Sequence, residues 1–563
     1  MGKTLILTEK PSVAKNIADA LKIKSRQDGY FEGSDYIITW AFGHLLQLFD
    51  AKDYDEKMAK WRTENFPFIP DKFRYKVKSN QKNRDKEDLG AKKQLKIIYS
   101  LIKRNDVTNL ISACDYDREG QIIGDTILYM IKHGKKVYRL LLNEWTPNEI
   151  LKSLKNIISN DEMMPLRDAG IGRQWADWTI GINLTSMATL KYQKGKGQAL
   201  NIGRVLLPTL KIIYDRDKEI ENFVPEDYFK LKALFATRSG SEYEGIYYLN
   251  NEDKFKDKQV LMDIHSLLSG KEGAVSEKNV EKKIEYPPYL FNLSNLQGFI
   301  TNKYQGWTSD KVLRISQSLY EKKLITYPRT SSNFLDESLV ERAENVLNAL
   351  KKGLPYESEL RFTRTKRVFN SKKVESHSAI IPTYLIPKAL TNDEMIVYSA
   401  VKNRFLMQFM PIAEYEETTL KTTINNVEGE LLSKGKVQLV EGWKKVEKIE
   451  SKDTILPLVN INEVVSIEDH KLTSHVTKPP KYHTEKTLLR VMETCGKGKD
   501  KEDEDSEEMM AAILSGYSIG TPATRAETIK KLKDVGYIST QNKNLICTEL
   551  GRKLVETFPV KDL

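Results

Sequence analysis

The chain has 563 residues, of which 40% are hydrophobic and 30% are charged, so it is large enough for several globular domains and is not a disordered polyelectrolyte. No segment reaches the roughly 18 consecutive apolar residues of a membrane span, and the first residues lack the apolar core of a secretory signal, so we expect a cytoplasmic protein with no membrane contact. The 89 Lys and Arg residues outnumber the 78 Asp and Glu residues, an excess that favours a polyanion such as nucleic acid as partner.

The first 150 residues contain two predicted strand-to-helix units. Residues 4–8 form a short apolar run that ends at Glu9, and a helix is expected to begin at Pro11. Residues 110–114 have the pattern of a buried strand and precede an acidic turn and an amphipathic helix over 121–131. Alternating strands and helices predict a Rossmann-like parallel sheet.

Basic and aromatic residues are interleaved over 60–76, and a highly charged stretch follows to about residue 93. Aromatic side chains among cations are typical of a surface that stacks the bases of single-stranded nucleic acid along a phosphate track. A surface loop held down by aromatic anchors explains the same pattern equally well.

Beyond residue 150 the chain alternates between helical and strand-like segments. Helical periodicity is expected over 148–218, over 290–348 and from 485 onward, and mixed strands over 228–249 and 418–468. Paired prolines at 287–288 and 479–480 mark boundaries. The charged stretch 496–508 is predicted to be a solvated loop or the exposed start of a helix.

The strongest local signal for chemistry is the run of acids at Asp115, Asp117 and Glu119. On an extended strand end these carboxylates would project from one side, where their repulsion favours a divalent cation such as Mg²⁺. An EF-hand is excluded because Thr126 stands where the bidentate Glu is required, while a solvated acidic turn stays open. Glu9 also follows a predicted parallel strand, so it is expected at the same edge of the sheet.

Lys10, beside Glu9, suits contact with a phosphate, although a lysine at a strand end is commonly just exposed to solvent. No Gly-x-x-x-x-Gly-Lys-Ser/Thr loop occurs in the chain, so neither a nucleotide cofactor nor an ATP-driven motor is expected.

Several segments carry a family resemblance. Thr-Glu-Lys-Pro-Ser at 8–12, with the Asp-x-Asp-x-Glu-Gly motif at 115–120, resembles the toprim domain of type IA topoisomerases, certain primases and some nucleases. Leu-Ile-Thr-Tyr-Pro-Arg-Thr-Ser-Ser at 324–332 resembles the nucleophile segment of the type IA topoisomerases specifically. The segments at 201–205 and 376–383 resemble, in family order, a DNA-contacting segment and the segment of the active-site histidine.

Near the C-terminus, segments 479–489 and 520–526 resemble the bacterial topoisomerase III branch of that family. Three positions depart from the usual pattern. Asn201 and Leu206 stand where the family has Ser and Gln, and Gln121 replaces the commoner Glu at the end of the acidic motif.

The resemblance implies a multidomain α/β and α+β fold that closes into a toroid. It divides the chain into a toprim domain, a helical DNA-binding base of the gate, a mixed β arch and a helical domain that carries the nucleophilic tyrosine. The corresponding residues are 1–150, then 151–217 with 469–563, then 218–288 with 388–468, and finally 289–387.

The implied activity is that of a topoisomerase III, which cleaves single-stranded DNA through a 5′-phosphotyrosyl intermediate, passes a strand and religates. Tyr327 is the implied nucleophile, and the other catalytic residues are Arg329, Glu9, Lys10 and His377. Mg²⁺ would be held by Glu9, Asp115, Asp117 and Glu119. DNA would be contacted by Arg173, Asp177, Asn201, Ile202, Gly203, Arg204, Val205 and Leu206.

Tyr327 on its own is a weak nucleophile, since its pKa is normally near 10, and cationic neighbours such as Arg329 are needed to stabilise the phenolate. Arg173 and Asp177 also fit an ordinary pair one helical turn apart. The expected partners are single-stranded and underwound DNA, with a helicase as a candidate, and the protein is expected to be a nucleoid-associated monomer. A toprim nuclease and a non-catalytic single-strand binder remain as alternatives.

Overall fold

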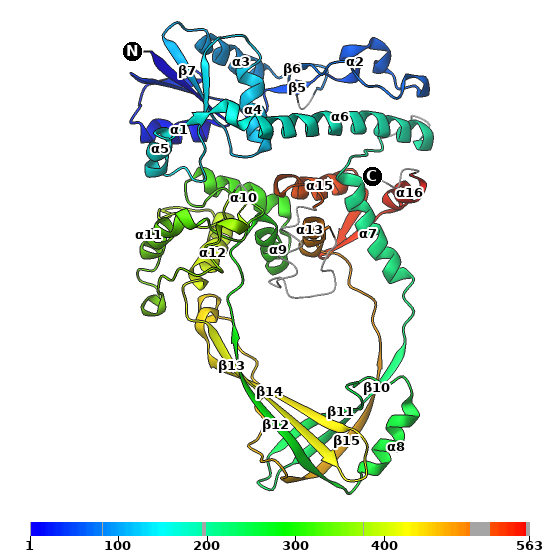
Figure 1. The fold of residues 1–563 in the computed structure, drawn as a ribbon. Helices are drawn as coiled ribbons and strands as arrows, with labels where there is room; N and C mark the ends of the chain where they lie inside the picture. Colours follow the sequence, from blue (N-terminus) through cyan, green and yellow to red (C-terminus); the bar gives the residue numbers. More distant parts are fainter. Residues whose placement is uncertain (1, 81–82, 194–198, 375–376, 496–517, 559–563) are drawn as a thin grey trace.

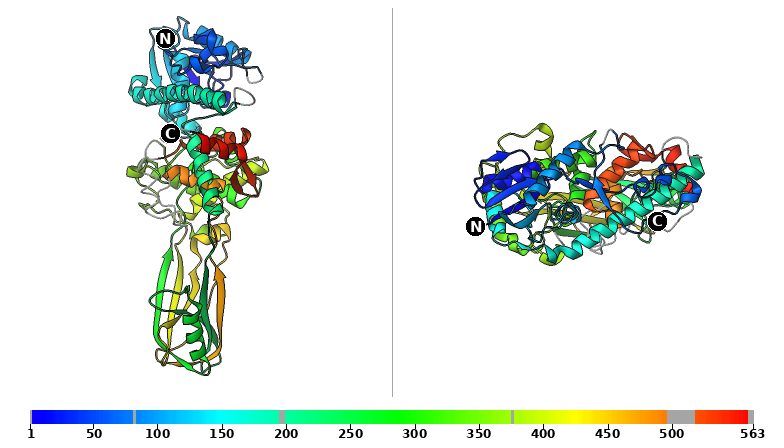
Figure 2. Two further views of the ribbon diagram at one scale, coloured as in Figure 1. Left: turned by 90° about the vertical axis from the view of Figure 1, so that its right-hand side faces the viewer. Right: turned by 90° about the horizontal axis from the view of Figure 1, so that it is seen from above.

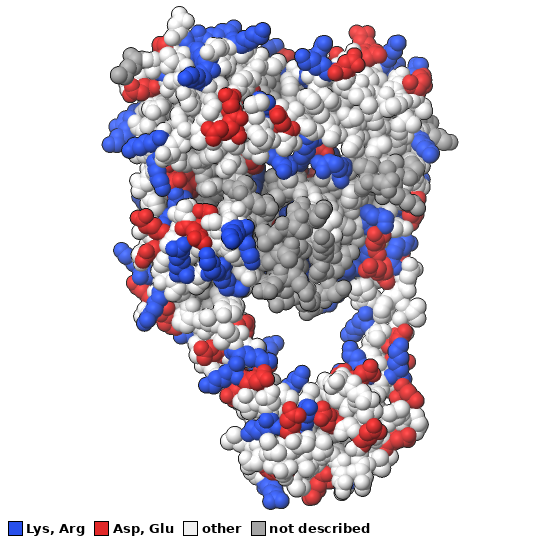
Figure 3. Space-filling view, in the orientation of Figure 1, with Lys and Arg blue, Asp and Glu red and all other residues white. Residues whose placement is uncertain are grey.

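The computed structural model describes residues 2–80, 83–193, 199–374, 377–495 and 518–558. The charged stretch 496–508 and Ser376 lie outside these residues. The described elements form four units, and Figure 1 shows an opening between the helices in the middle of the view and the strands at the bottom. In the space-filling view of Figure 3 the opening passes through the molecule, with Lys and Arg side chains on both sides of its rim. The toroidal, multidomain fold is therefore confirmed.

The sheet unit at the N-terminus is a seven-stranded sheet in the order β2-β3-β4-β1-β7-β8-β9. Its four central strands are parallel, as predicted. They are β4 (Tyr36–Trp40), β1 (Lys3–Thr8), β7 (Val107–Ala113) and β8 (Lys136–Arg139). The edge strands, all antiparallel to their neighbours, are β2 (Arg26–Gln27), β3 (Tyr30–Glu32) and β9 (Ile158–Ser159).

Helices cover both faces of this sheet, which is why β1 is apolar at successive positions. Leu5 and Leu7 pack with α3 (Leu89–Ile102) and α4 (Arg118–Leu128). Ile6, on the other face, packs with α1 (Pro11–Ala20) and α5 (Pro147–Leu154). With β1 between β4 and β7, the carboxyl ends of these strands meet at one edge of the sheet.

The base unit is organised by α6 (Met164–Gln193), a helix of 30 residues that runs across the molecule in Figures 1 and 2. The aromatic segment after α2 (Ala51–Tyr54) packs partly on this helix. The Phe73 ring stacks on Trp175 at 4.8 Å, and Phe68 lies 6.1 Å from Trp178. Aromatic anchoring is thus correct for Phe68 and Phe73.

The rest of the base unit joins segments that are far apart in the sequence. Buried side chains from both regions form one core. Besides α6, the base unit contains α7 (Leu206–Glu221), α13 (Glu485–Thr494), α15 (Pro522–Asp534), β16 (Ile538–Gln541), β17 (Asn544–Cys547) and α16 (Glu549–Thr557). No helix within the described ranges combines the length and apolarity needed to cross a bilayer.

The barrel unit is a closed barrel in the order β10-β11-β14-β13-β12-β15, and closure leaves its strands without free edges. Figure 2 shows it as an elongated part that extends away from the helices. The strands are β10 (Asp227–Ala236), β11 (Glu242–Tyr248), β12 (Glu272–Glu285), β13 (Ala413–Ile424), β14 (Glu430–Val440) and β15 (Val464–Val476), with α8 (Lys258–Leu268) packed on them.

The helical unit contains α9 (Leu293–Lys303), α10 (Ser309–Glu321), α11 (Val340–Leu350) and α12 (Asn392–Met407). The predicted division assigned 388–468 to the arch, but α12 packs on α9 and α10 instead. The reason is apolar burial, since Val397 and Val401 share a core with Leu319. The other domain boundaries stay predictions.

Candidate active site

The candidate site lies at the boundary between the sheet unit and the helical unit. One apolar core runs continuously across this boundary, joining Ile17 of α1 and Ile150 of α5 to Leu319 and Ile325 of the helical unit. The carboxyl ends of β1 and β7 therefore face the segment that follows α10, and the two units are closed on each other.

Tyr327 lies in that segment and is only 1% exposed. Its hydroxyl donates a hydrogen bond to Asp117 Oδ2 at 2.6 Å, across 210 residues of sequence. Its backbone N–H donates to the carbonyl of Asn143 at 2.8 Å. Burial and the charges of Asp117 and Asp115 raise the pKa of Tyr327 well above its ordinary value, so the hydroxyl keeps its proton in this state.

Asp117 and Glu119 do not continue the strand, which corrects the predicted one-sided arrangement of the acids. Asp117 is the N-cap of α4, and its carboxylate accepts a hydrogen bond from Gly120 N–H at 2.7 Å, while Glu119 lies in the first helical turn. A side chain at Gly120 would come within 2.2 Å of the Asp115 carbonyl oxygen. Glycine thus allows the helix to begin directly against the strand end.

The pKa of Asp117 reflects opposing effects. Burial raises it, but Arg329, whose Nη1 lies 3.6 Å from Oδ2, and the hydrogen bonds from Gly120 and Tyr327 bring it below its usual value. Asp117 is therefore a carboxylate that already has partners from both units.

Glu9 and Asp115, unlike Asp117, each have a carboxylate oxygen without a hydrogen-bond partner. They are 5% and 2% exposed, and Glu9 Oε2 and Asp115 Oδ2 have no hydrogen-bond partner. Burial raises the pKa of both carboxyls, and the charge of Glu9 adds to the effect on Asp115. Paired buried oxygens without partners are the donor set that a hard divalent cation satisfies, so these residues fit Mg²⁺.

Glu119 is directed elsewhere. Its carboxylate contacts His44 Nε2 at 3.2 Å and Arg173 Nη1 at 3.8 Å, and these partners lower its pKa despite burial. Within the described part of the chain, no three Asp, Glu, His or Cys side chains form a group that would hold a metal ion. The predicted four-acid set is therefore not assembled in this arrangement.

Behind the acids lies Arg139, which sequence reasoning missed. It is fully buried and donates hydrogen bonds to the carbonyl oxygens of Ser112, Cys114 and Asp115 at 3.1, 2.7 and 2.7 Å. Its Nε donates to Gln121 Oε1 at 2.9 Å. Gln121, which stands where the family commonly has Glu, therefore helps to hold Arg139 in place. The available signal was an arginine directly before three consecutive leucines, at residues 140–142.

His377 connects the two units from the helical side. Its Nδ1 lies 2.8 Å from Asn143 Oδ1, and its Nε2 contacts the Tyr116 carbonyl oxygen. Its ring centre is 4.6 Å from that of Tyr327, and burial lowers its pKa. Neither Asn143 nor the carbonyl of Tyr116 was marked by a motif.

Lys10 and Arg329 complete the cationic side of the site. Lys10 Nζ contacts Glu321 Oε1 at 3.0 Å and lies 4.0 Å from Glu9 Oε1. Arg329 Nε is buried without a hydrogen-bond partner. Burial disfavours the charge of Arg329, but the neighbouring acids and Tyr327 still raise its pKa. Arg329 therefore lies beside Tyr327 and Asp117, and Lys10 lies beside Glu9 and Glu321.

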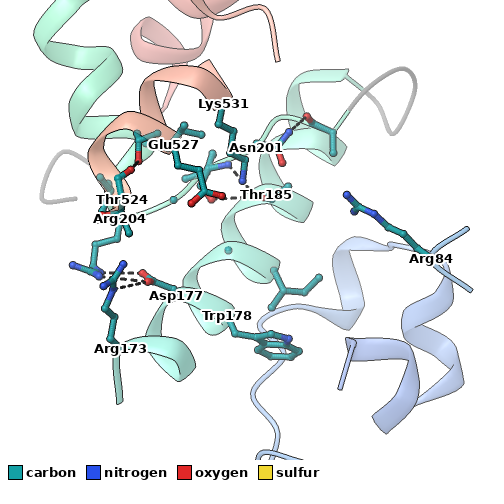
Figure 4. A pocket seen from close by; sticks show the side chains of 18 of the residues that line it. Arg84, Arg173, Asp177, Trp178, Thr185, Asn201, Arg204, Thr524, Glu527 and Lys531 are labelled. Carbon is teal, nitrogen blue, oxygen red and sulfur yellow. Dashed lines mark hydrogen bonds and ion pairs between the residues drawn. The ribbon is translucent and has the colours of Figure 1, made fainter. Parts of the chain in front are cut away.

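All of the predicted DNA-contacting residues line one groove of about 690 Å³ in the base unit (Figure 4). Residues outside this predicted set also line it, among them Trp61, Arg84, Trp178, Thr524, Glu527 and Lys531. Trp61 belongs to segment 60–76, for which base stacking was one of the two interpretations. Trp61 and Arg84 come from the charged, aromatic region that follows α2, and Thr524, Glu527 and Lys531 from α15.

Within this groove Asp177 is shared by two arginines, as Figure 4 shows. Arg204 Nε lies 3.1 Å from its carboxylate and Arg173 Nε 3.5 Å. Since Arg173 also reaches Glu119, polar side chains continue from the groove to the acidic edge. Ile202 and Leu206 instead bury most of their side chains in the core below.

A toroidal fold of four units, a parallel sheet with acids at its carboxyl edge and a buried tyrosine facing those acids are together typical of the DNA topoisomerases. Sequence comparison gives the same result. The DNA topoisomerase family model matches residues 161–563, and the Toprim domain model matches residues 4–145. The chain belongs to the type IA DNA topoisomerases.

Its relatives include DNA topoisomerase 3 of Staphylococcus aureus strains USA300 and Mu50. Each is 32% identical over 566 residues, covering 99% of this chain and 76% of the relative. Among solved structures, full-length topoisomerase I from Thermotoga maritima is similar with a TM-score of 0.70 and 26% identity, covering 98% of this chain and 82% of that one. The prediction of a type IA topoisomerase is thereby confirmed.

Proposed function

We propose that this chain acts as a topoisomerase III, with Tyr327 attacking a phosphodiester of single-stranded DNA. The phenol oxygen forms a bond to phosphorus and gives its proton to Asp117, while the bond from phosphorus to the 3′-oxygen breaks. The 3′-oxygen takes a proton from water and leaves as a hydroxyl, so that the tyrosine carries the 5′-phosphate. The observation that carries the proposal is the hydrogen bond of 2.6 Å between Tyr327 and Asp117 at a closed boundary between two units.

The neighbours of Tyr327 have distinct roles in this reaction. Asp117 is placed to accept the proton of the attacking hydroxyl. Arg329, with an unsatisfied Nε, and Lys10 neutralise the phosphate. His377 aligns the loop of Tyr116 with the tyrosine segment.

The Toprim domain is a metal-binding domain, and in this chain Glu9 and Asp115 are the residues that would hold Mg²⁺, with Asp117 as a third ligand once it leaves the partners that it has in the closed arrangement. An ion held there would offset the clustered negative charge and supply a binding point for a phosphate of the DNA. The unpartnered oxygens of Glu9 and Asp115 support this assignment.

The groove that contains Arg173, Arg204 and Trp178 suits a single strand, because it offers cations for phosphates and an aromatic ring for a base. The covalent link conserves the bond energy of the phosphodiester, so resealing requires no nucleotide cofactor. The opening through the ring accommodates a second strand, which passes when the sheet and helical units separate.

Relatives named DNA topoisomerase 3 support the assignment to topoisomerase III, and the activity that we propose includes decatenation as well as relaxation. We place the protein in the cytoplasm at the nucleoid, acting as a monomer on underwound DNA, with a helicase as the candidate partner that supplies unpaired strands.

Rapid denaturation tests the proposal. The protein is mixed with Mg²⁺ and single-stranded DNA labelled at either end, quenched with detergent, and analysed on a denaturing gel. Protein should remain attached to the 5′ end of the downstream fragment. Free ends without attached protein would favour the toprim nuclease, and uncut DNA would favour a strand binder.

A further inference from the structure

Glu321, the last residue of α10, connects the helical unit to the sheet unit. Its Oε1 accepts a hydrogen bond from Lys10 Nζ at 3.0 Å, and its Oε2 accepts one from Ser12 Oγ at 2.8 Å. Its carbonyl oxygen accepts one from Asn16 Nδ2, also at 3.0 Å. All three donors lie at or near α1, which faces α10 across the boundary in Figure 1.

This position is unfavourable for an acid unless it has such partners. The C-terminal end of a helix carries partial negative charge, which repels a carboxylate. The side chain of Glu321 is also 23% exposed, so water screens it only in part. Burial alone would raise its pKa, but Lys10 and Ser12 lower it below the usual value. The sheet unit therefore keeps Glu321 ionised at the end of α10.

Lys10 cannot fully satisfy both Glu321 and a DNA phosphate. It follows Glu9 directly, and its ammonium group lies between the Glu9 and Glu321 carboxylates, at 4.0 and 3.0 Å. A phosphate that approaches the acidic edge brings a competing negative charge to the same cation.

We propose that Glu321 is a positioning residue that occupies Lys10 while the site is free of DNA, and that arrival of a phosphate displaces it and so weakens the closed boundary. This inference rests on the proposed role of Lys10 in binding phosphate. DNA binding and opening of the ring are coupled through one carboxylate, because the contact that the phosphate disrupts is also one that holds α10 to α1.

The position of Glu321 in the chain makes the coupling direct. Helix α10 continues into the segment that carries Tyr327. Loss of the contact with Lys10 therefore acts on the element that must move with the covalently bound strand. Other contacts remain across the boundary, including the pair of Arg342 with Glu149, so displacement of Glu321 loosens the boundary without dissolving it.

A double-mutant cycle on DNA affinity tests the inference. Glu321→Gln, Lys10→Gln and the double variant are made in a Tyr327→Phe background, so that no strand is cut. Binding of a fluorescein-labelled single-stranded oligonucleotide is measured by anisotropy. Glu321→Gln should tighten binding about fivefold, the effect of losing one partly exposed ion pair. In the Lys10→Gln background the same change should have no effect.

The control is Asp310→Asn, which removes an acid from the same helix, where it pairs with Arg314 at 3.1 Å. Its affinity should equal that of the parent. Unchanged affinity in Glu321→Gln would overturn the inference. Equal tightening with and without Lys10 would also overturn it, since that result indicates only the removal of a negative charge near DNA.

A second readout follows the boundary itself. Fluorophores are attached at Lys24→Cys and Lys352→Cys, both exposed positions, after the exposed Cys495 is replaced by Ser. Without DNA, Glu321→Gln should increase the fraction of molecules with separated dyes about fivefold. An unchanged fraction would refute the link to opening. A chain that forms the 5′ adduct but shows no coupling would refute only this inference, while a missing adduct would refute the proposed function.

Discussion

The substitution Tyr327→Phe should abolish covalent attachment to DNA while leaving the protein folded and able to bind a single strand. The phenyl ring keeps its contacts with His377 and Tyr320, whose ring centres lie 4.6 and 5.4 Å away. Only the hydrogen bond to Asp117 is lost, and Asp117 keeps its bond from Gly120. We therefore expect a loss of stability of about 1 kcal/mol, the usual net value of one hydrogen bond.

The assay uses end-labelled single-stranded DNA, Mg²⁺ and a detergent quench, with urea denaturation to measure stability. Tyr320→Phe is the matched control, because it removes a hydroxyl from a second fully buried tyrosine of the same core, and it should retain the adduct. A 5′-linked adduct in Tyr327→Phe would show that another tyrosine is the nucleophile. A loss of stability near that of a core deletion, about 3 kcal/mol or more, would refute the account of the Asp117 contact.

Three further variants test the acids, the buried arginine behind them and the groove. Asp115→Asn combined with Asp117→Asn should abolish Mg²⁺-dependent relaxation on gels, because these carboxylates are needed to bind the ion, and full activity at ordinary Mg²⁺ would contradict the metal site. Arg139→Met should cost roughly 2–4 kcal/mol in urea denaturation, because several buried carbonyl groups lose their donor; a neutral result would contradict its role. Arg204→Ala should weaken binding of single strands and reduce the slope of log affinity against log salt by about 0.7, and an unchanged slope would place Arg204 off the DNA path.

Much of the fold was predictable because local patterns and tertiary packing agree. The apolar run of β1 predicts a strand covered on both faces, and the structure places α1 and α3 on those faces. The aromatic segment was open to two interpretations, and packing on α6 settled Phe68 and Phe73 because their rings found Trp178 and Trp175.

The acidic motif shows where local reasoning fails. Period-two alternation assumed that the strand continued past Asp115, whereas Asp117 has the side chain of a good N-cap and begins a helix. As a consequence Glu119 contacts His44 and Arg173 and does not join the other acids.

The contacts between the sheet unit and the helical unit could not be predicted from the sequence. The partner of Tyr327 lies 210 residues away and that of Lys10 lies 311 residues away. No periodicity or spacing relates such positions, so only folding of the whole chain brings Asp117 and Glu321 to them. The segment resemblance implies that Tyr327 is the nucleophile, but it gives no information on which residues contact Tyr327 while DNA is absent.

The topology of the products provides the final test of the reaction. A single tyrosine cuts one strand at a time, and a groove that binds unpaired bases engages a duplex only where it is underwound. Negative supercoiling supplies the unpairing and positive supercoiling opposes it. We therefore expect ATP-independent, Mg²⁺-dependent relaxation of negatively supercoiled circles in single steps of linking number, while positively supercoiled circles should resist unless they contain a single-stranded bubble. Gels that resolve individual topoisomers decide this, since double steps, a requirement for ATP, or equally fast relaxation of bubble-free positive supercoils would each contradict cleavage of one strand by Tyr327.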